Sequence, residues 1–283
     1  MPSLLPEQVQ QINQLVRRCG QQARQMATEE FQVYEKGVND YVTNVDRTLD
    51  QLLTERLTQL FPGDGLISEE NADSWETIHL RDRRLWLIDP LDGTDDFIHR
   101  KPHYSVMVGA MADYQPCAGW VYAPEFDQMY FGGEDVGLFQ IDSNRAPTPL
   151  IPKTPALPAP DFCPILIGYK DQKRYGEAIV KQVPAAKFDS IGSFGLKVLQ
   201  VIQGHAGLYL YLNGRVKLWD TVGPVALAQA AGLVCCDLAG NALRFSPDAI
   251  DIPTLAHQQP IIIGWPAYVN ELRSRLETAV ALA

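Results

Sequence analysis

Apolar and polar residues repeat with a helical period in the first part of the chain and with shorter, strand-like runs after it. Over residues 9–26 and 45–60, apolar residues recur every three or four positions, which is the repeat of one helix face. Pro62 and Gly63 then end the second pattern, as residues that stop helices do. From residue 85 to 141, short runs rich in β-branched and aromatic residues alternate with turn residues. We therefore expect two helices followed by a sheet.

The second half of the chain begins with a proline-rich stretch. Six prolines lie among the fourteen residues from Pro147 to Pro160, which excludes a regular helix or a central strand there. Beyond it, the pattern predicts strands near 164–170, 206–212 and 260–265, and helices over 194–203, 221–231 and 268–283. We expect an α/β (layered α+β) protein with an N-terminal part (1–146), a proline-rich connection (147–160) and a C-terminal part (161–283).

Composition and charge narrow the possible functions. The chain has 283 residues, 46% of them hydrophobic, and a formal net charge of -10, which argues against a nucleic-acid partner. The longest apolar stretch, Val225–Cys236, is too short to cross a bilayer and predicts a buried helix, so no membrane partner is expected. The N-terminus lacks the pattern of a signal peptide, and the five cysteines form no C-x-x-C pair. These features predict a cytoplasmic protein.

Negative charge gathers at the end of one apolar run. In "LWLIDPLDGTDDF" (85–97), four large apolar residues lead directly into four aspartates within eight positions. Burial and mutual repulsion both oppose such a cluster, unless cations neutralise it. Further acidic residues stand near predicted element ends elsewhere in the chain: Asp46, Glu69, Glu70 and Asp220. Carboxylates from distant strand ends make an oxygen-rich site of the kind that magnesium prefers.

The turn "DPLDGT" (89–94) adds an anion site to this cation site. Pro90 fixes a turn that directs Asp89 and Asp92 to one place, with the carbonyl of Leu91 as a further ligand. The amides of Gly93 and Thr94 open onto a turn or helix N-terminus that favours an anion such as phosphate. Metal ions beside a phosphate indicate phosphoryl transfer to water.

Four motifs together resemble those of the inositol monophosphatase superfamily, which comprises magnesium-dependent, lithium-sensitive phosphatases. They are "DYVTNVD" (40–46), "ISEE" (67–70), "DPLDGT" (89–94) and "WD" (219–220), in the family's order and over nearly the whole chain. The resemblance implies a five-layer αβαβα fold, two to three Mg²⁺ ions, inhibition by Li⁺ and a homodimer.

The same resemblance implies roles for individual residues. Glu69, Asp89 and the Leu91 carbonyl hold a first metal; Asp89, Asp92 and Asp220 hold a second; and a third ion lies by Glu69 through waters. Thr94, with Asp46 behind it and Glu69 nearby, activates the attacking water. Five residues are predicted to contact the substrate: Asp92, Gly93, Thr94, Lys197 and Asn213.

The substrate itself stays open between two branches of the superfamily. The metal-proximal motifs favour an inositol monophosphatase, which is the preferred prediction. Two stretches, "GLKVLQVIQG" (195–204) and "KLWDTVGP" (217–224), instead resemble 3'(2'),5'-bisphosphate nucleotidases, and nucleotide-directed members have a lysine in a setting similar to that of Lys197 in "GSFGLK". Asn213 stands seven residues before Asp220, where inositol monophosphatases have a glutamate, and this departure weakens the inositol assignment. A non-catalytic regulatory protein on the same fold is the alternative of another class, although no acidic ligand is missing.

Overall fold

The computed structural model describes residues 3–37, 40–71, 77–79 and 83–283. Their contacts divide the chain into two compact units. The first comprises Met1–Leu150, Gly192–Leu196 and Leu218–Leu227, and the second comprises Ile151–Ile191, Lys197–Lys217 and Ala228–Ala283. The predicted division into 1–146, 147–160 and 161–283 stays a prediction about folding units.

A mixed sheet forms the centre of the first unit. Among the described residues its strand order is β3-β4-β5-β6-β7-β8-β9, with β3 and β4 parallel and the other pairs antiparallel. The strands are β3 (Gly65–Ser68), β4 (Leu85–Asp92), β5 (Ser105–Ala112), β6 (Gln115–Ala123), β7 (Gln128–Gly133), β8 (Gly137–Asp142) and β9 (Thr148–Pro149). Proline is tolerated in β9 because this strand lies at the sheet edge.

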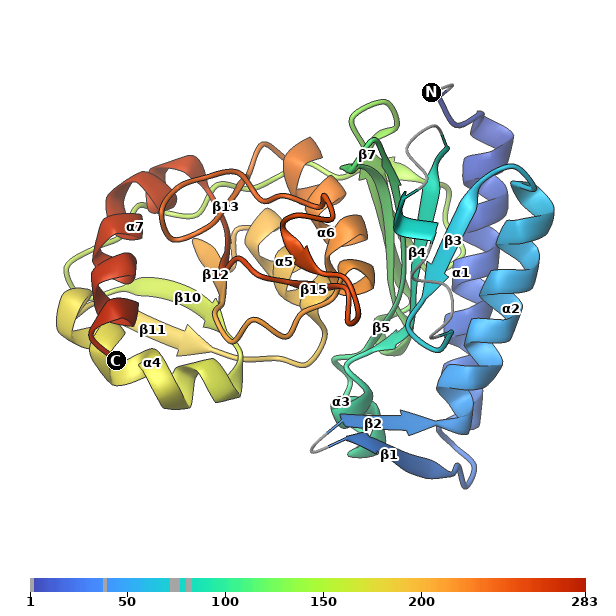
Figure 1. Ribbon diagram of the computed structural model, residues 1–283, viewed down its shortest axis with the longest axis horizontal. Coiled ribbons are helices and arrows are strands. Elements are labelled where there is room, and N and C mark those ends of the chain that lie inside the picture. Colours follow the sequence, from blue (N-terminus) through green and yellow to red (C-terminus); the bar gives the residue numbers. More distant parts are fainter. Residues whose placement is uncertain (1–2, 38–39, 72–76, 80–82) are drawn as a thin grey trace. The chain divides into compact units, whose positions relative to one another are not determined.

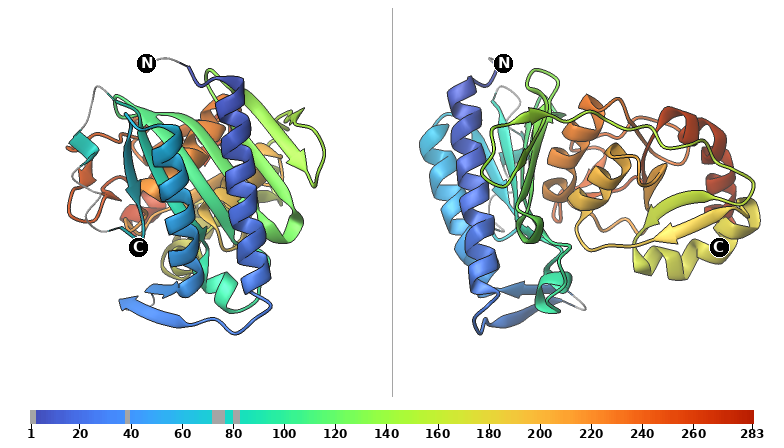
Figure 2. Two further views of the ribbon diagram at one scale, coloured as in Figure 1. Left: turned by 90° about the vertical axis from the view of Figure 1, so that its right-hand side faces the viewer. Right: turned by 180° about the vertical axis from the view of Figure 1, so that it is seen from behind.

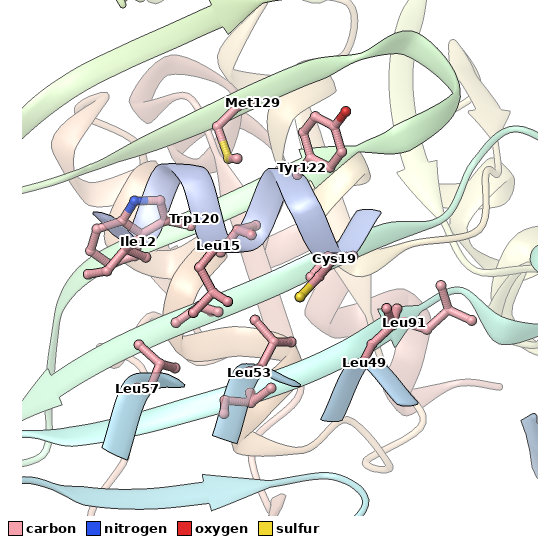
Figure 3. Packing of buried hydrophobic residues seen from close by; sticks show 14 of the residues in the cluster. Ile12, Leu15, Cys19, Leu49, Leu53, Leu57, Leu91, Trp120, Tyr122 and Met129 are labelled. Carbon is pink, nitrogen blue, oxygen red and sulfur yellow. The ribbon is translucent and has the colours of Figure 1, made fainter. Parts of the chain in front are cut away.

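Two long helices, α1 (Pro6–Met26) and α2 (Asn44–Leu60), lie side by side across one face of this sheet (Figures 1 and 2). Their apolar stripes meet the strands in one buried cluster. Figure 3 shows Ile12, Leu15 and Cys19 of α1, and Leu49, Leu53 and Leu57 of α2, beside strand residues that include Trp120 and Met129. Each buried leucine-sized side chain contributes roughly 1.5–3 kcal/mol, so this cluster stabilises the unit strongly.

Smaller elements complete the first unit. A hairpin of β1 (Val33–Gly37) and β2 (Asp40–Thr43) precedes α2, and two short helices follow β4 and β6. These are α3 (Thr94–Ile98) and η2 (Pro124–Phe126).

The second unit contains another mixed sheet, of order β11-β10-β12-β16-β13 within the described residues. Its strands are β10 (Cys163–Ile167), β11 (Ala186–Asp189), β12 (Leu208–Tyr211), β13 (Val234–Cys236) and β16 (Ile261–Gly264). The remaining elements of the chain's second half are α4 (Tyr169–Gln182), α5 (Phe194–Ile202), α6 (Leu218–Ala230), β14 (Ile250–Asp251), β15 (Ala256–His257) and α7 (Pro266–Ala281). Both α5 and α6 begin in the first unit and end in the second.

The predicted elements are present with two corrections. The predicted strand 164–170 is shorter, because β10 ends at Ile167 and α4 begins at Tyr169. The apolar stretch Val225–Cys236 is not one buried helix, because α6 ends at Ala230 and β13 begins at Val234. Gly232, with φ of 81°, reverses the chain between them in a conformation that favours glycine. The predicted α/β class is confirmed. No helix among the described residues has the length and apolar character that a membrane crossing requires.

Candidate active site

Strand β4 changes character along its length and ends in a bulge. Leu85 to Ile88 pair regularly with β5, but Asp89 lies opposite Met107 and Asp92 lies opposite Ser105. Three steps on β4 therefore match two steps on β5, which inserts one extra residue and re-aims the side chains that follow. Pro90 fits this bulge because it has no amide hydrogen to donate. The bulge brings two aspartates to the same end of the sheet.

The third aspartate comes from α6, far along the sequence. Asp220 lies in the first turn of this helix, whose Gly223 packs directly on β5 and β6. A Cβ on Gly109 would lie 2.5 Å from the Gly223 nitrogen, and a Cβ on Gly119 would lie 2.1 Å from the Gly223 oxygen. Glycine is therefore required on the sheet for the helix to approach so closely.

The three carboxylates form a tight group. Asp89, Asp92 and Asp220 each offer one oxygen, and these oxygens lie within 4.8 Å of one another. Asp89 is fully buried. Its Oδ1 accepts a hydrogen bond of 3.0 Å from the Leu91 amide, while its Oδ2, although buried, has no hydrogen-bond partner. Buried polar atoms almost always have partners, so an oxygen without one indicates a ligand such as a metal ion.

The electrostatic environment of Asp89 supports the same interpretation. Burial raises the pKa of the Asp89 carboxyl well above its usual range, and the neighbouring carboxylates of Glu69, Asp92 and Asp220 raise it further. Like charges at this distance oppose ionisation, and a hard cation would reverse that effect. The donor set therefore fits a magnesium ion, which takes oxygen ligands.

Glu69 lies beside this group without being one of its three members. It follows β3, and its amide donates a 3.1 Å hydrogen bond to the Ile88 carbonyl at the end of β4. Its carboxylate is close enough to raise the pKa of Asp89. The structure thus brings together the predicted acidic residues Glu69, Asp89, Asp92 and Asp220.

Thr94 and Asp46 are also in contact. The Thr94 hydroxyl lies 3.0 Å from the Leu91 carbonyl oxygen and 3.3 Å from Asp46 Oδ1. Asp46 is buried at the third position of α2, where its Oδ2 accepts a 2.8 Å hydrogen bond from the amide of Thr43, the N-cap residue. This capping box holds one carboxylate oxygen in place and leaves the other facing Thr94.

Gly93 connects the bulge to α3. It has φ of 92°, and a Cβ there would lie 3.0 Å from both the His103 carbonyl oxygen and the Ser193 amide nitrogen. Both facts require glycine at this position. Because α3 has only five residues, its dipole is small, and an anion at this turn would depend on the Gly93 and Thr94 amides themselves.

The two remaining predicted residues belong to the second unit. Lys197 on α5 is 6% exposed, with its Nζ 5.5 Å from the centre of the Tyr209 ring. Asn213 follows β12, and its Oδ1 accepts a 3.2 Å hydrogen bond from the Arg215 amide. The buried carboxylate of Asp171 also bonds to Asn213 and accepts a 2.8 Å hydrogen bond from the Leu212 amide.

Sequence reasoning missed the residues that hold Asp92. Its Oδ2 accepts hydrogen bonds from the Ser193 hydroxyl and, at 3.0 Å, from the Gly195 amide. Ser193 precedes an apolar helical run, a pattern that marks a helix N-cap. Its contact with Asp92 spans 101 positions, so no pattern in the neighbouring sequence could predict it.

Comparison with known proteins assigns the family. The chain matches the model of the inositol monophosphatase family over residues 5–270. This chain belongs to the inositol monophosphatase family. It is 31% identical over 246 residues to the 3'(2'),5'-bisphosphate nucleotidase CysQ of Aggregatibacter actinomycetemcomitans, a match that covers 87% of this chain and 90% of CysQ. It is 26% identical over 253 residues to an inositol monophosphatase of Mesembryanthemum crystallinum, with 87% and 89% covered.

Solved structures of family members share the fold. Staphylococcal IMPase-I, complexed with products, superposes with a TM-score of 0.76 at 21% identity, over 96% of each chain. The prediction of an inositol monophosphatase-type fold is therefore confirmed. So is the predicted enzyme class: this family member is a phosphoric monoester hydrolase.

Proposed function

We propose that this phosphatase hydrolyses a nucleoside 3'(2'),5'-bisphosphate, such as adenosine bisphosphate, with magnesium. One observation carries the reaction class. Asp89, Asp92 and Asp220 lie together, and the buried Oδ2 of Asp89 has no hydrogen-bond partner. The substrate is supported by the 31% identity to CysQ over most of both chains. The preference for an inositol phosphate, which came from the sequence motifs, stays a prediction. The experiment below compares the two substrates.

Each metal ligand proposed here comes from the cluster just described. Glu69, Asp89 and the Leu91 carbonyl would hold one ion, and Asp89, Asp92 and Asp220 a second, with a third ion by Glu69. Magnesium dependence is general to the family. When bound, the metal supplies an activated water and stabilises the charge that develops on the departing oxygen.

Thr94 and Asp46 are proposed to handle the proton of the attacking water. The Thr94 hydroxyl is within 3.3 Å of Asp46 Oδ1, so it can accept a proton from water while passing its own to the carboxylate. Asp46 is restrained by the capping box, which keeps the acceptor in place without further reorganisation. Glu69, whose carboxylate lies near Asp89, would be a further proton acceptor.

The turn at Gly93 and Thr94 is proposed to bind the phosphate that is cleaved. Two successive amides pointing to one side form a small anion site. The glycine allows the close packing against His103 and Ser193 that sets this turn. Asp92 would contact the substrate from the same turn.

Lys197 and Asn213 are proposed to distinguish the substrates. Lys197 is almost fully buried beside Tyr209, and a buried ammonium is retained where it meets a negative group. The second phosphate of a bisphosphate offers such a group, and an inositol monophosphate does not. Asn213, in place of a glutamate, can hydrogen-bond a hydroxyl but adds no negative charge near a doubly phosphorylated substrate.

The experiment is a phosphate-release assay with three substrates and magnesium: adenosine 3',5'-bisphosphate, inositol 1-phosphate and a small aryl phosphate. We expect the highest kcat/KM for the bisphosphate. Lys197→Ala should lower that value by about 10-fold or more, the cost of leaving a charged partner unpaired, and should leave the aryl phosphate unaffected. Lys173→Ala is the control, because Lys173 is exposed on the same unit. Higher kcat/KM for inositol 1-phosphate would overturn the proposed substrate.

An inositol phosphate is the second candidate because of the plant inositol monophosphatase relative. If it is the substrate, Asn213→Ala should raise KM for inositol 1-phosphate, since a hydroxyl loses its partner. The same substitution should leave the aryl phosphate unaffected. An unchanged KM for inositol 1-phosphate would show that Asn213 does not recognise this substrate.

Three further expectations follow from the family. Lithium should inhibit the enzyme, nearly uncompetitively with respect to substrate, in a titration of lithium chloride at fixed magnesium.

Light scattering should show a homodimer. Fractionation of the source cells should find the enzyme in the cytoplasm, as its free cysteines suggest.

A further inference from the structure

Ser193 is a fully buried serine at the point where α5 begins. Its amide donates a 3.0 Å hydrogen bond to the His103 carbonyl oxygen. A Cβ on its neighbour Gly192 would lie 2.3 Å from that same oxygen and 2.5 Å from Asp96 Oδ2. The backbone is therefore pressed against the segment before β5, and the position of the Ser193 side chain is fixed by the backbone.

The hydroxyl of Ser193 uses its full hydrogen-bonding capacity. It donates to Asp92 Oδ2, and it accepts a 3.0 Å hydrogen bond from the Leu196 amide. The Ser105 hydroxyl oxygen lies 2.8 Å away. Since a hydroxyl has one hydrogen and Ser193 gives it to the carboxylate, Ser105 must be the donor in this second contact. Ser105 therefore donates a hydrogen bond to Ser193, and Ser193 donates one to Asp92.

This chain of hydroxyls restrains a single carboxylate oxygen. Asp92 Oδ2 receives the Ser193 hydroxyl and the Gly195 amide, two donors from the N-terminal turn of α5. Two donors on one oxygen fix the plane of the carboxylate group. Asp92 also presents an oxygen within 4.8 Å of oxygens from Asp89 and Asp220. Fixing Asp92 therefore sets its distance from the other two carboxylates of the group.

We propose that Ser193 is a positioning residue of the metal site, which aligns the Asp92 carboxylate for magnesium and is itself oriented by Ser105. The inference rests on the proposed metal binding by Asp89, Asp92 and Asp220. Residues that orient metal ligands in this way alter metal affinity or activity by roughly 10–100-fold when they are removed. Ser193 acts through its hydrogen bond to Asp92, so its removal should change the affinity for magnesium.

The test is calorimetric titration of magnesium chloride into the metal-free protein, without substrate. Ser193→Ala should raise the Kd for Mg²⁺ by about 10–100-fold, and its kcat at saturating magnesium should fall much less. Ser105→Ala is the matched control, because it removes an equally buried hydroxyl that reaches Asp92 only through a second hydrogen bond, the one to Ser193. This variant should change the Kd by only a few-fold. An unchanged Kd in Ser193→Ala, or an equal change in Ser105→Ala, would overturn the proposal.

A second variant separates positioning from loss of folding. Ser193→Cys keeps the approximate volume but replaces a strong donor by a weak one, and it should also raise the Kd, on the order of 10-fold. If Ser193→Cys folds and binds magnesium as the wild type does, Ser193 has no positioning role. Absence of magnesium binding in the wild type would instead reject the proposed metal site, so the two failures are distinguishable.

Discussion

Two aspartates are almost equally buried in this molecule, and their surroundings are opposite. Asp171, in the second unit, is 1% exposed and is met by donors, namely the Leu212 amide at 2.8 Å and the Asn213 backbone and side chain. Asp89, in the first unit, is 0% exposed and is surrounded by carboxylates, with its Oδ2 lacking a partner. Burial raises the pKa of both carboxyls; at Asp171 hydrogen bonds and Arg174 counteract this effect, whereas at Asp89 the neighbouring carboxylates add to it.

The contrast separates a structural carboxylate from a functional one. Asp171 is balanced within the protein and fixes the loop that carries Asn213. The surroundings of Asp89 are unfavourable within the protein alone, which is the arrangement expected where a cation completes the site. Burial alone does not distinguish the two roles; the sign of the neighbouring groups does.

The largest predicted effect separates the two aspartates by activity. Asp89→Asn should lower kcat/KM for a small aryl phosphate by at least about 100-fold, or roughly 2.7 kcal/mol of transition-state stabilisation, because this carboxylate serves both proposed metals. Asp171→Asn should retain most of that activity. Retention of more than a tenth of wild-type activity by Asp89→Asn would contradict the assignment.

A second prediction concerns how Asp220 reaches Asp89. Gly119→Ala adds a methyl group where Gly223 of α6 already touches the sheet, so the helix must move away and carry Asp220 with it. Displacement of a catalytic group by about 1 Å can cost on the order of 100-fold in rate. Gly63→Ala is the control, since a Cβ there meets nothing within 4 Å. Full activity in Gly119→Ala would show that close packing of α6 is not required.

A third prediction tests the structural role of Asp171. Asp171→Ala leaves the buried Leu212 amide without its acceptor and should reduce the free energy of unfolding by about 1.5–3 kcal/mol in urea titrations. Asp161→Ala, an exposed substitution in the same unit, should change it by less than about 0.5 kcal/mol. Equal stability of the two variants would remove the distinction drawn above.

The smallest predicted effect is a pH dependence from another buried group. Burial lowers the pKa of the His257 imidazole from 6.5 to about 4. Between these values the unfolded chain binds a proton that the folded chain does not, so the free energy of unfolding decreases as the pH falls. The loss between pH 7 and pH 5 is about 2 kcal/mol. It should be absent in His257→Gln and retained in His205→Gln, which alters an exposed histidine of the same unit. An unchanged pH dependence of the free energy of unfolding in His257→Gln would show that His257 does not cause it.

Local sequence predicted the parts of the site that are local in the fold. Asp89, Leu91, Asp92, Gly93 and Thr94 are contiguous, so a proline, a glycine and their spacing were enough to indicate a turn with converging oxygens. Asp46 was recognisable at the start of an apolar helical pattern. Asp220 lies 131 residues after Asp89; its place at a predicted element end made it a candidate ligand, and the family motif assigned it to the second metal.

The parts that were not predicted depend on packing between distant segments. Ser105 and Ser193 are 88 positions apart, and a buried serine has no pattern that reveals its partner. The boundary between α6 and β13 was missed for a different reason. The apolar run continues through it, and only the positive φ of Gly232 reveals the break.

The most direct test of the metal-site account is the free energy of unfolding of the wild type and Asp89→Asn, each measured with EDTA and with magnesium. With EDTA, Asp89→Asn should be at least as stable as the wild type, because the substitution removes a charge that is repelled by its neighbours. With magnesium at 100 times its Kd, the wild type should gain about 2.7 kcal/mol and become the more stable of the two. If Asp89→Asn is less stable than the wild type by the same amount in both conditions, Asp89 is a structural residue and the account is wrong.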